Sequence, residues 1–403
     1  MTIATRSPIP SHVPPELVVD IDVYNQPDGA VDPQKAWRCF KGKGPLVFSP
    51  YNGGHWIPTV GDDVFRFYRD AQHYSNRLVA IPDPDADKML PIQADAPDHS
   101  QYRAHIQSLF TPKAIDRLEP KIRALTIELI EGFRAKGECE FVSEFSMPLP
   151  INIFLQMMGL PLEDRPYLRN LIEIYVTDPD IEHKAAAHVE VHHYMDKWIE
   201  KRLAEPTDDG VTLVTKGTIN GRPYTRDEML GTLTLLLHAG LDTVVNMLAF
   251  IVLHLARSPS DREYIRKNHD KMPDIIQELL RRFSGPNLGR VVAQDHTYKG
   301  VLLKKGDRVI LPVSLFNMDE EKMEDPDTVD LTRSNARHIT FGAGAHTCAG
   351  ALLARREIAI FLEEWLARIP DFETDPTRPV NMRALPQNSV FELWLRWKPA
   401  AAH

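Results

Sequence analysis

The sequence predicts a mainly α-helical fold with a smaller β part, because helical patterns cover far more of the chain than strand patterns do. Helical spacing of apolar residues extends over 114–134, 181–204, 225–257 and 274–283. Short apolar and β-branched runs predict strands at 46–49, 55–59, 291–295, 301–303 and 308–311. Turns are expected at Lys299-Gly300 and Lys305-Gly306, next to the later strands.

The composition favours one large domain that acts on small molecules or proteins. No Ser/Gly linker, low-complexity tract or repeat divides the 403 residues, so we expect a single domain spanning residues 1–403. The net charge of −9 argues against a nucleic-acid partner. Residues 1–16 show neither a secretion signal nor a membrane anchor, and we expect them to be flexible. The three widely spaced cysteines, Cys39, Cys139 and Cys348, favour a reducing cytoplasm over a disulfide framework.

Two segments in the first hundred residues have distinct patterns. The runs 46–49 and 55–59 predict two strands that pair with each other. The Pro-rich stretch 80–97 contains too many helix breakers for a long helix, and we expect a mobile loop over a pocket.

The apolar stretch 229–256 is long enough to cross a bilayer, but its polar residues would be costly in lipid. These residues are His238, Asp242, Asn246 and His254. We therefore expect a helix buried in the protein core. It begins with a capping box, in which Glu228 follows Thr225 by three residues. Near its middle, Gly240 leaves space beside an acid and a hydroxyl, Asp242 and Thr243, which are costly to bury without a purpose.

A lone cysteine lies in a Gly-rich loop directly before a helical pattern at 351–366. Cys348 would sit near the positive end of that helix, and Gly344 and Gly350 would let backbone amides approach its sulfur. A cysteine ligates metal only as the thiolate, which such an environment favours. The alternative is a free cysteine buried at a turn.

The pattern Phe-x-x-Gly-x-His-x-Cys-x-Gly at 341–350 resembles the haem-binding loop of the cytochrome P450 family. The resemblance implies the cytochrome P450 fold, with haem b between the long central helix and the cysteine-loop helix. It further implies that Cys348 is the iron ligand and that Phe341, His346 and Gly350 contact the cofactor.

The central helix carries a second match. Ala239, Gly240, Asp242 and Thr243 resemble the family's oxygen-activation motif, in which an acid and an alcohol deliver protons while O2 is cleaved. Without the resemblance, Thr243 could equally bond to the preceding helical turn, and Asp242 could pair with a distant arginine.

Other matches concern the scaffold and the haem propionates. Glu278 and Arg281 form the family's Glu-x-x-Arg pair, which a third residue, Arg333, would complete. The residues that match propionate contacts are His99, Arg103, Arg290 and His346. His99 and Arg103 are spaced i, i+4, which alone would also fit a solvated helix face.

From about residue 103 onward the chain resembles the bacterial camphor hydroxylase and related terpenoid hydroxylases. Matching pocket positions name as substrate neighbours Met89, Ile92, Leu235, His238 and Leu288, with Gln387 less secure. Where the camphor enzyme has a ketone-binding tyrosine, this chain has Asp87 or Lys88, which puts camphor itself in doubt. His238 could either contact substrate or bond a backbone carbonyl.

The resemblance implies a cytoplasmic monooxygenase, monomeric and not bound to a membrane. It would use O2 to hydroxylate a monoterpenoid or norisoprenoid at an unactivated C–H bond. No flavin fingerprint or iron–sulfur cysteine set is present, so electrons would come from a 2Fe–2S ferredoxin and its NAD(P)H-dependent reductase. The basic residues expected to meet the ferredoxin are Arg103, Arg337, Arg355 and Arg356. The alternatives are a peroxide-dependent haem-thiolate hydroxylase and a haem-based ligand sensor without turnover.

Overall fold

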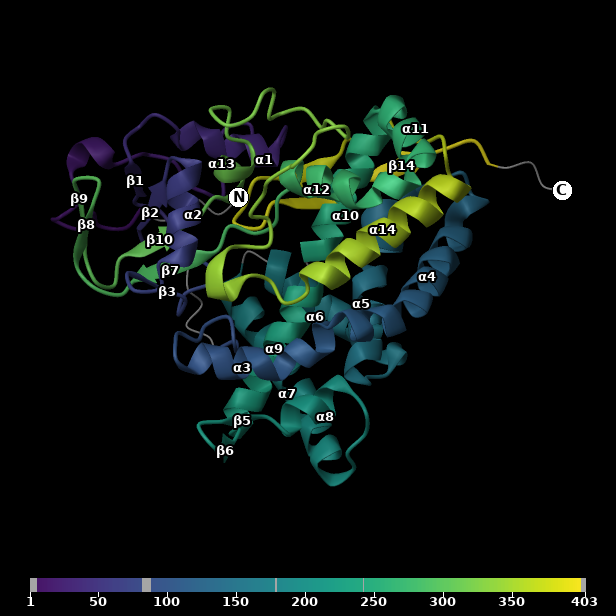
Figure 1. Ribbon diagram of the computed structural model, residues 1–403, viewed down its shortest axis with the longest axis horizontal. Helices are drawn as coiled ribbons and strands as arrows, with labels where there is room; N and C mark the ends of the chain where they lie inside the picture. The colour runs from purple at the N-terminus through teal and green to yellow at the C-terminus, as the bar shows by residue number, and fades with distance from the viewer. Residues whose placement is uncertain (1–5, 82–87, 178–179, 242, 400–403) are drawn as a thin grey trace.

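Helices dominate the protein, as the sequence predicts (Figure 1). The computed structural model describes residues 6–81, 88–177, 180–241 and 243–399. Helices account for 51% of the chain and strands for 11%, which confirms a mainly α fold with a smaller β part. The largest sheet lies to one side of the molecule, and the long helices α4 and α14 lie on the other.

The helices are α1 (Pro33–Ala36), α2 (Gly61–Arg69), α3 (Asp98–Gln107), α4 (Pro112–Arg134), α5 (Pro148–Met158), α6 (Arg165–Thr177), α7 (Ile181–Ala204), α8 (Gly210–Thr215), α9 (Arg226–Leu241), α10 (Thr243–Arg257), α11 (Pro259–Lys267), α12 (Met272–Arg282), α13 (Val313–Asn317) and α14 (Ala351–Arg368). The strands are β1 (Leu46–Ser49), β2 (His55–Pro58), β3 (Tyr74–Ser75), β4 (Glu138–Glu140), β5 (Thr218–Ile219), β6 (Arg222–Pro223), β7 (Gly289–Val292), β8 (His296–Tyr298), β9 (Val301–Leu303), β10 (Arg308–Ile310), β11 (Glu373–Thr374), β12 (Asn381–Arg383), β13 (Ser389–Glu392) and β14 (Trp394–Arg396).

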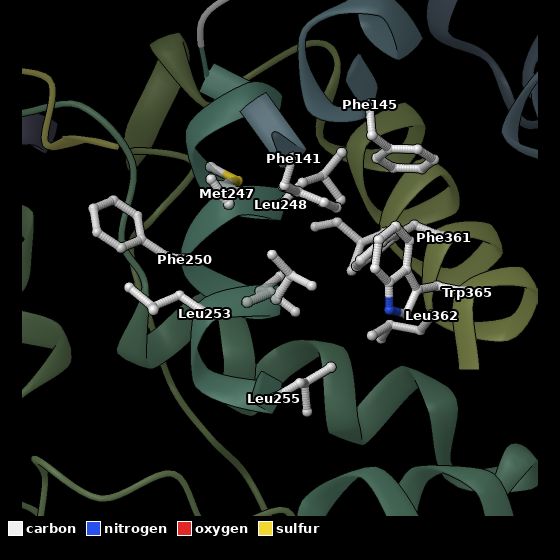
Figure 2. Packing of buried hydrophobic residues seen from close by; sticks show 14 of the residues in the cluster. Phe141, Phe145, Met247, Leu248, Phe250, Leu253, Leu255, Phe361, Leu362 and Trp365 are labelled. Atoms are coloured by element: carbon white, nitrogen blue, oxygen red, sulfur yellow. The ribbon is translucent and has the colours of Figure 1, made fainter. Parts of the chain in front are cut away.

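The helix that follows the cysteine loop, α14, is fixed by its apolar face. All the apolar residues that predicted this helix are buried, namely Ile358, Phe361, Leu362, Trp365 and Leu366. Figure 2 shows Phe361 and Trp365 directed toward the side chains of α10, beside Phe141 and Phe145. The rings of Trp365 and Phe141 meet edge to face, with centroids 5.2 Å apart. Each such side chain contributes about 1.5–3 kcal/mol on burial, so this cluster holds α14 and the loop before it in place.

The long apolar stretch forms α9 and α10, on either side of residue 242, which lies outside the described residues. The capping box is present: Glu228 N–H donates to Thr225 Oγ1 at 3.3 Å, and Thr225 N–H donates to Glu228 Oε2 at 2.6 Å. Within the described ranges, the stretch Arg226–Arg257, which contains α9 and α10, is the one stretch long and apolar enough to cross a membrane, and 75% of its apolar window is buried in the protein. That burial agrees with the predicted core helix. Its polar Asn246 accepts a hydrogen bond from Val390 N–H at 3.0 Å.

The main sheet has the order β1-β2-β10-β7-β3. The predicted pairing of 46–49 with 55–59 is confirmed by the antiparallel register Leu46↔Pro58 to Ser49↔His55. β10 is parallel to β2 and antiparallel to β7. This sheet places β7, and with it Arg290, in the interior of the protein.

One predicted strand had the wrong bounds, and one strand was missed. The strand expected at 291–295 is β7, which already begins at Gly289 because Gly289 pairs with Ile310. A separate strand, β8, was missed: it pairs with β9 across the turn at Lys299 and Gly300, both of which have positive φ. After the turn at Lys305-Gly306 the chain enters β10, which belongs to the main sheet and does not pair with β9.

The prediction for 1–16 fails in the part that the structure describes, whereas the prediction that 80–97 forms no long helix holds in its described part. We expected residues 1–16 to be flexible, but within 6–16 the chain is held to the body. Ser7 N–H donates to Pro50 O at 2.8 Å, Val13 is buried, and His12 Nε2 lies 2.8 Å from Asp307 Oδ2. In the 80–97 stretch, residues 80–81 and 88–97 are described and contain no helix, as predicted.

Candidate active site

The cysteine loop presents its sulfur at the start of α14. Cys348 N–H donates to Phe341 O at 2.8 Å, and Gly342 and Gly344 adopt positive φ values of 75° and 78°, which close the loop tightly. The backbone amides of Gly350 and Ala351 hydrogen-bond the sulfur, as predicted for a loop that stabilises a thiolate.

Cys348 is exposed, yet protein atoms surround it closely enough for desolvation to raise the pKa of its thiol. The amides and the charges of Arg103 and Arg355 act in the opposite direction, toward the thiolate. Because desolvation is the largest influence, these donors alone do not favour the thiolate, and a metal cation at the sulfur would. The chemistry of this donor set therefore fits a haem iron.

Two histidines from distant segments meet beside this loop. The ring centroids of His99, on α3, and His346 lie 3.8 Å apart. Burial lowers the pKa of His99, and burial, with a further contribution from the nearby positive charge of Arg290, lowers the pKa of His346 to about 3. Both imidazoles are therefore neutral near neutral pH and can donate a ring N–H to an anion.

A buried arginine faces the same region. Arg290 is only 2% exposed; its Nη1 donates to Gly289 O at 2.7 Å, and its guanidinium lies 5.0 Å from the ring centroid of Tyr68. Its Nε and Nη2 atoms have no hydrogen-bond partner among the described residues. Burial lowers the pKa of Arg290, as expected for a charge held away from water. A carboxylate bound to these two nitrogens would satisfy them, which fits a haem propionate.

On the same side, Arg355 is fixed by a residue that the sequence did not single out. Gln277 Oε1 accepts from Arg355 Nε at 3.3 Å, from Arg355 Nη2 at 3.2 Å and from His338 Nε2 at 3.0 Å. The guanidinium of Arg355 lies 4.5 Å from the ring centroid of Phe341. Arg355 is therefore held over the cysteine loop without a carboxylate partner among these contacts, so its charge acts on Cys348.

The oxygen-activation motif is only partly visible, because Asp242 lies outside the described residues. Thr243 begins α10, and its hydroxyl donates to Ala239 O at 3.1 Å, the back-bond that was the alternative interpretation of this residue. The hydroxyl oxygen can still accept a hydrogen bond in this arrangement. At Gly240, a Cβ would meet only Phe154 Cδ2, at 3.9 Å, so this glycine leaves space beside the helix.

The proposed substrate neighbours lie on four segments, and backbone hydrogen bonds connect these segments two by two. Leu90 N–H donates to Gly231 O at 3.2 Å, which brings the part of the chain with Met89 and Ile92 onto α9, where Leu235 and His238 lie. Asn287 N–H donates to Pro386 O at 2.7 Å, which joins the segments of Leu288 and Gln387. Of the two residues at the tyrosine position, Asp87 lies outside the described residues and Lys88 is exposed.

The scaffold triad is assembled as expected. Arg281 Nε and Nη2 each donate to the Glu278 carboxylate at 2.7 Å, and both side chains are fully buried. Arg333 Nε lies 3.4 Å from Glu278 Oε2, and Asp330 N–H donates to Glu278 Oε1 at 2.9 Å. The remaining Arg281 donors bind backbone carbonyls of Asn317, Pro326 and Thr328. The triad thus ties α12 to the segment that leads to the cysteine loop.

A separate surface groove of about 720 Å³ lies between α4, α5 and α6 and is lined in part by Arg165 and Arg169. None of the predicted site residues lines this groove, so the candidate active site is the region around Cys348, His346 and Arg290.

A mainly α fold with a cysteine at a helix start, and with buried cationic and imidazole groups around it, is typical of haem-thiolate oxidoreductases. The family model described as cytochrome P450 matches residues 162–391. A protein of Sinorhizobium fredii named "Probable cytochrome P450 127A1" is 34% identical over 387 residues, which cover 93% of this chain and 93% of that protein. Cytochrome P450(MEG) of Priestia megaterium is 31% identical over 341 residues, covering 80% and 83% of the two chains.

Two crystal structures are similar to this one throughout. That of CYP101J2 has a TM-score of 0.90 and 35% identity, and that of CYP101C1 has a TM-score of 0.89 and 38% identity. Each covers 97% of this chain and 100% of the solved chain. The chain belongs to the cytochrome P450 family. It is a haem b monooxygenase that uses O2 and an organic substrate, which confirms the predicted fold, cofactor and enzyme class.

Sequence reasoning missed Tyr68, which contacts Arg290, Gln277, which contacts Arg355, and His338, which contacts Gln277. No local signal could have identified them, because each acts through a contact between distant segments. It also missed Gly231, although an isolated glycine inside a helical pattern is a known sign of close backbone approach.

Proposed function

We propose that this monooxygenase hydroxylates an unactivated C–H bond of a small hydrophobic compound, a monoterpenoid or norisoprenoid. The observation that carries the proposal is the make-up of the face that α9 turns to the 88–92 segment. Its substrate neighbours include the buried Leu235 and the half-buried Met89, which are apolar, and the half-buried imidazole of His238, which is polar. Such a surface suits a compact apolar ligand with one oxygen function.

In this proposal Cys348 ligates the iron, and Phe341 and Gly350 line the cofactor on the same side. Arg290, with its two unsatisfied nitrogens, binds a propionate, and His99, Arg103 and His346 share the remaining propionate contacts. The bound haem supplies the activation of O2 that no side chain can provide.

Thr243 and Asp242 would deliver the protons that the reaction consumes. The Thr243 hydroxyl, positioned by Ala239 O, can accept or donate a hydrogen bond, and Asp242 would be its acidic partner in proton delivery. Gly240 keeps the helix surface clear for O2.

His238 selects the oxygen function of the substrate. Its Nδ1 must donate to Thr234 O, at 2.8 Å, because a carbonyl only accepts. Burial lowers the pKa of His238, so the ring is neutral and its Nε2 is an acceptor. An acceptor favours a substrate hydroxyl over a ketone, in line with the doubt about camphor.

Electrons come from a 2Fe–2S ferredoxin with an NAD(P)H-dependent reductase, which docks over the cysteine loop. Arg355 and the exposed Arg337 supply the positive surface that meets the ferredoxin, whereas Arg103 is committed to the propionate in this proposal. Arg356 contributes less than expected, because it is paired with Asp116 and Glu119. We further propose that the protein is a cytoplasmic monomer with one domain. Because ferredoxin binding depends on opposite charges, its affinity should fall steeply as the salt concentration rises.

The test is an optical titration of the ferric protein with terpenoid alcohols, their ketones and their parent hydrocarbons. A substrate that displaces water from the iron shifts it toward high spin. We expect the strongest shift with a cyclic alcohol, and a loss of that preference in His238→Ala. If no member of the panel shifts the spin state, the terpenoid assignment is wrong. If alcohol and hydrocarbon lose affinity equally in His238→Ala, His238 only packs.

A further inference from the structure

Gly231, on α9, lies against the backbone of the segment 88–90. A Cβ atom at this position would lie 2.2 Å from Lys88 O, 3.4 Å from Lys88 C and 3.8 Å from Leu90 Cγ. A Cβ essentially never approaches another atom to less than 3.0 Å, and here the obstacle is backbone that cannot rotate away. The same glycine accepts the hydrogen bond from Leu90 N–H at 3.2 Å. The absence of a side chain therefore sets how closely this segment lies on α9.

The segment 88–97 is held on its other side as well, so it cannot shift as a whole. Gln93 closes it by accepting from Met89 N–H at 2.7 Å and ties it to the preceding strand region by donating to Arg77 O at 2.9 Å. Asp95 accepts from Asn76 N–H at 2.9 Å and from the Ser75 hydroxyl. A side chain at position 231 would therefore displace the backbone of the first few residues of the segment, because the residues that follow are fixed.

Those first residues are part of the core. Leu90 and Ala94 are 7% and 8% exposed and pack in the same cluster as Leu233 and Leu236 of α9. Tight packing of this kind resists an added methyl group, which forces backbone shifts.

The helix face beneath the segment is the one that carries the proposed substrate neighbours. Gly231, Leu235 and His238 are spaced i, i+4 and i+7, which places them on one side of α9. Residues 88–90 therefore cover the Gly231 end of that face.

We propose that Gly231 is a specificity-determining positioning residue: it lets the 88–97 segment close onto α9 and so limits the size of the ligand that reaches the haem. The size limit rests on the proposed placement of the substrate between α9 and this segment; the position of the segment itself does not.

The experiment compares Gly231→Ala with Gly132→Ala in the full, haem-loaded protein. Gly132 is a matched control, because it also lies within a helix, α4, and a Cβ there would meet nothing within 4 Å. Two quantities are measured: the hydrogen-exchange rate of the Leu90 amide, and the association rates of imidazole and 4-phenylimidazole with the ferric haem. The first needs no ligand, and neither probe depends on which substrate is natural.

We expect Gly231→Ala to speed Leu90 exchange by about tenfold or more, because overpacking destabilises the closed position. We also expect the rate for 4-phenylimidazole to rise at least about fivefold relative to imidazole. Gly132→Ala should change neither quantity. Leu90→Ala, which loosens the same contact from the segment side, should raise the same rate ratio and serves if Gly231→Ala does not fold.

Unchanged exchange in Gly231→Ala would overturn the claim that Gly231 positions the segment. Faster exchange with an unchanged rate ratio, in this variant and in Leu90→Ala, would overturn the size limit. A failed terpenoid titration of the wild type would leave both quantities as predicted, so the two proposals fail separately.

Discussion

The imidazole rings of His99 and His346 lie 3.8 Å apart, centroid to centroid, and this contact joins α3 to the loop before α14. Both rings have lowered pKa values, mainly because of burial. Two neutral rings can pack at this distance, with their planes 34° apart, where two imidazolium ions would repel. The contact brings the α3 residue Arg103 to the same side of the protein as Cys348, where its charge acts on the thiol.

Arg290 offers the clearest test of cofactor anchoring. Replacing it with methionine removes a buried charge whose Nε and Nη2 have no hydrogen-bond partner in the described part of the chain. We expect Arg290→Met to leave the haem-free protein as stable as the wild type or more stable. It should make the haem-loaded protein less stable by about 3 kcal/mol or more, because a propionate loses its partner. Chemical unfolding of both forms measures the difference.

Arg282→Met is the control for this test. Arg282 is also buried, but two of its three nitrogens have protein partners: its Nε donates to Asp327 O and its Nη2 to Asp32 Oδ2, and Nη1 alone has none among the described residues. This variant should destabilise both forms alike. An equal loss in the two forms of Arg290→Met would contradict the propionate role.

The triad at Glu278 predicts unequal costs for its two arginines. Arg281→Met leaves a fully buried carboxylate without its main partner and should cost about 3–5 kcal/mol of unfolding free energy. Arg333→Met should cost less, about 1–2 kcal/mol, because Arg333 is partly exposed and Glu278 keeps Arg281 and Asp330 N–H. Urea unfolding and haem retention measure both, and equal costs would refute this ranking.

Thr243→Ala should uncouple electron use from hydroxylation. The variant loses the hydroxyl that Ala239 O positions, while haem and substrate binding should remain. We expect product formed per NAD(P)H to fall about tenfold or more, with hydrogen peroxide released instead. Thr243→Ser keeps the hydroxyl and should retain most of the coupling. Normal coupling in Thr243→Ala would remove this residue from the mechanism.

Glu357 predicts a stability change with pH. Burial raises the pKa of this α14 carboxyl from 4.5 to about 8. Because the folded pKa lies above the unfolded one, the stabilisation is complete below about pH 4.5 and is lost as the pH rises through about 8. Each pKa unit corresponds to about 1.4 kcal/mol. Glu357→Gln, which cannot ionise, should therefore be more stable than the wild type near pH 9 and equal to it near pH 5.

Thermal unfolding of both proteins over this range measures the effect. Exposed Glu205→Gln on the same protein should show no such dependence. If Glu357→Gln is less stable than the wild type at every pH, the carboxyl makes an essential charged contact and the raised pKa is wrong.

The sequence predicted those features whose residues lie within one element. The capping box at Thr225 and Glu228, the Glu278–Arg281 pair and the cysteine loop all depend on spacings of a few residues, and the structure shows each of them. The apolar stripe of α14 was equally visible, because helical period alone decides which side is buried.

Contacts between distant segments were beyond the sequence. Gln277 reaches Arg355 only because α12 packs against α14, and Gly231 meets Lys88 only after the 88–97 segment has closed onto α9. β8 was missed because three residues give too short an alternating pattern to distinguish from a turn. Family resemblance alone proposed the propionate roles of Arg290 and His346, and it also favoured that role for His99 and Arg103, whose spacing alone fits a polar helix face as well.

The central claim is that the Cys348 thiolate ligates the haem iron. The most direct measurement is the absorption spectrum of the reduced protein with carbon monoxide, in the wild type and in three variants. Cys348→Ser should lose the red-shifted Soret band of thiolate-ligated haem, whereas Cys39→Ala and Cys139→Ala, at the other two cysteines, should keep it. A red-shifted band that survives in Cys348→Ser, or disappears in either control, would contradict the account.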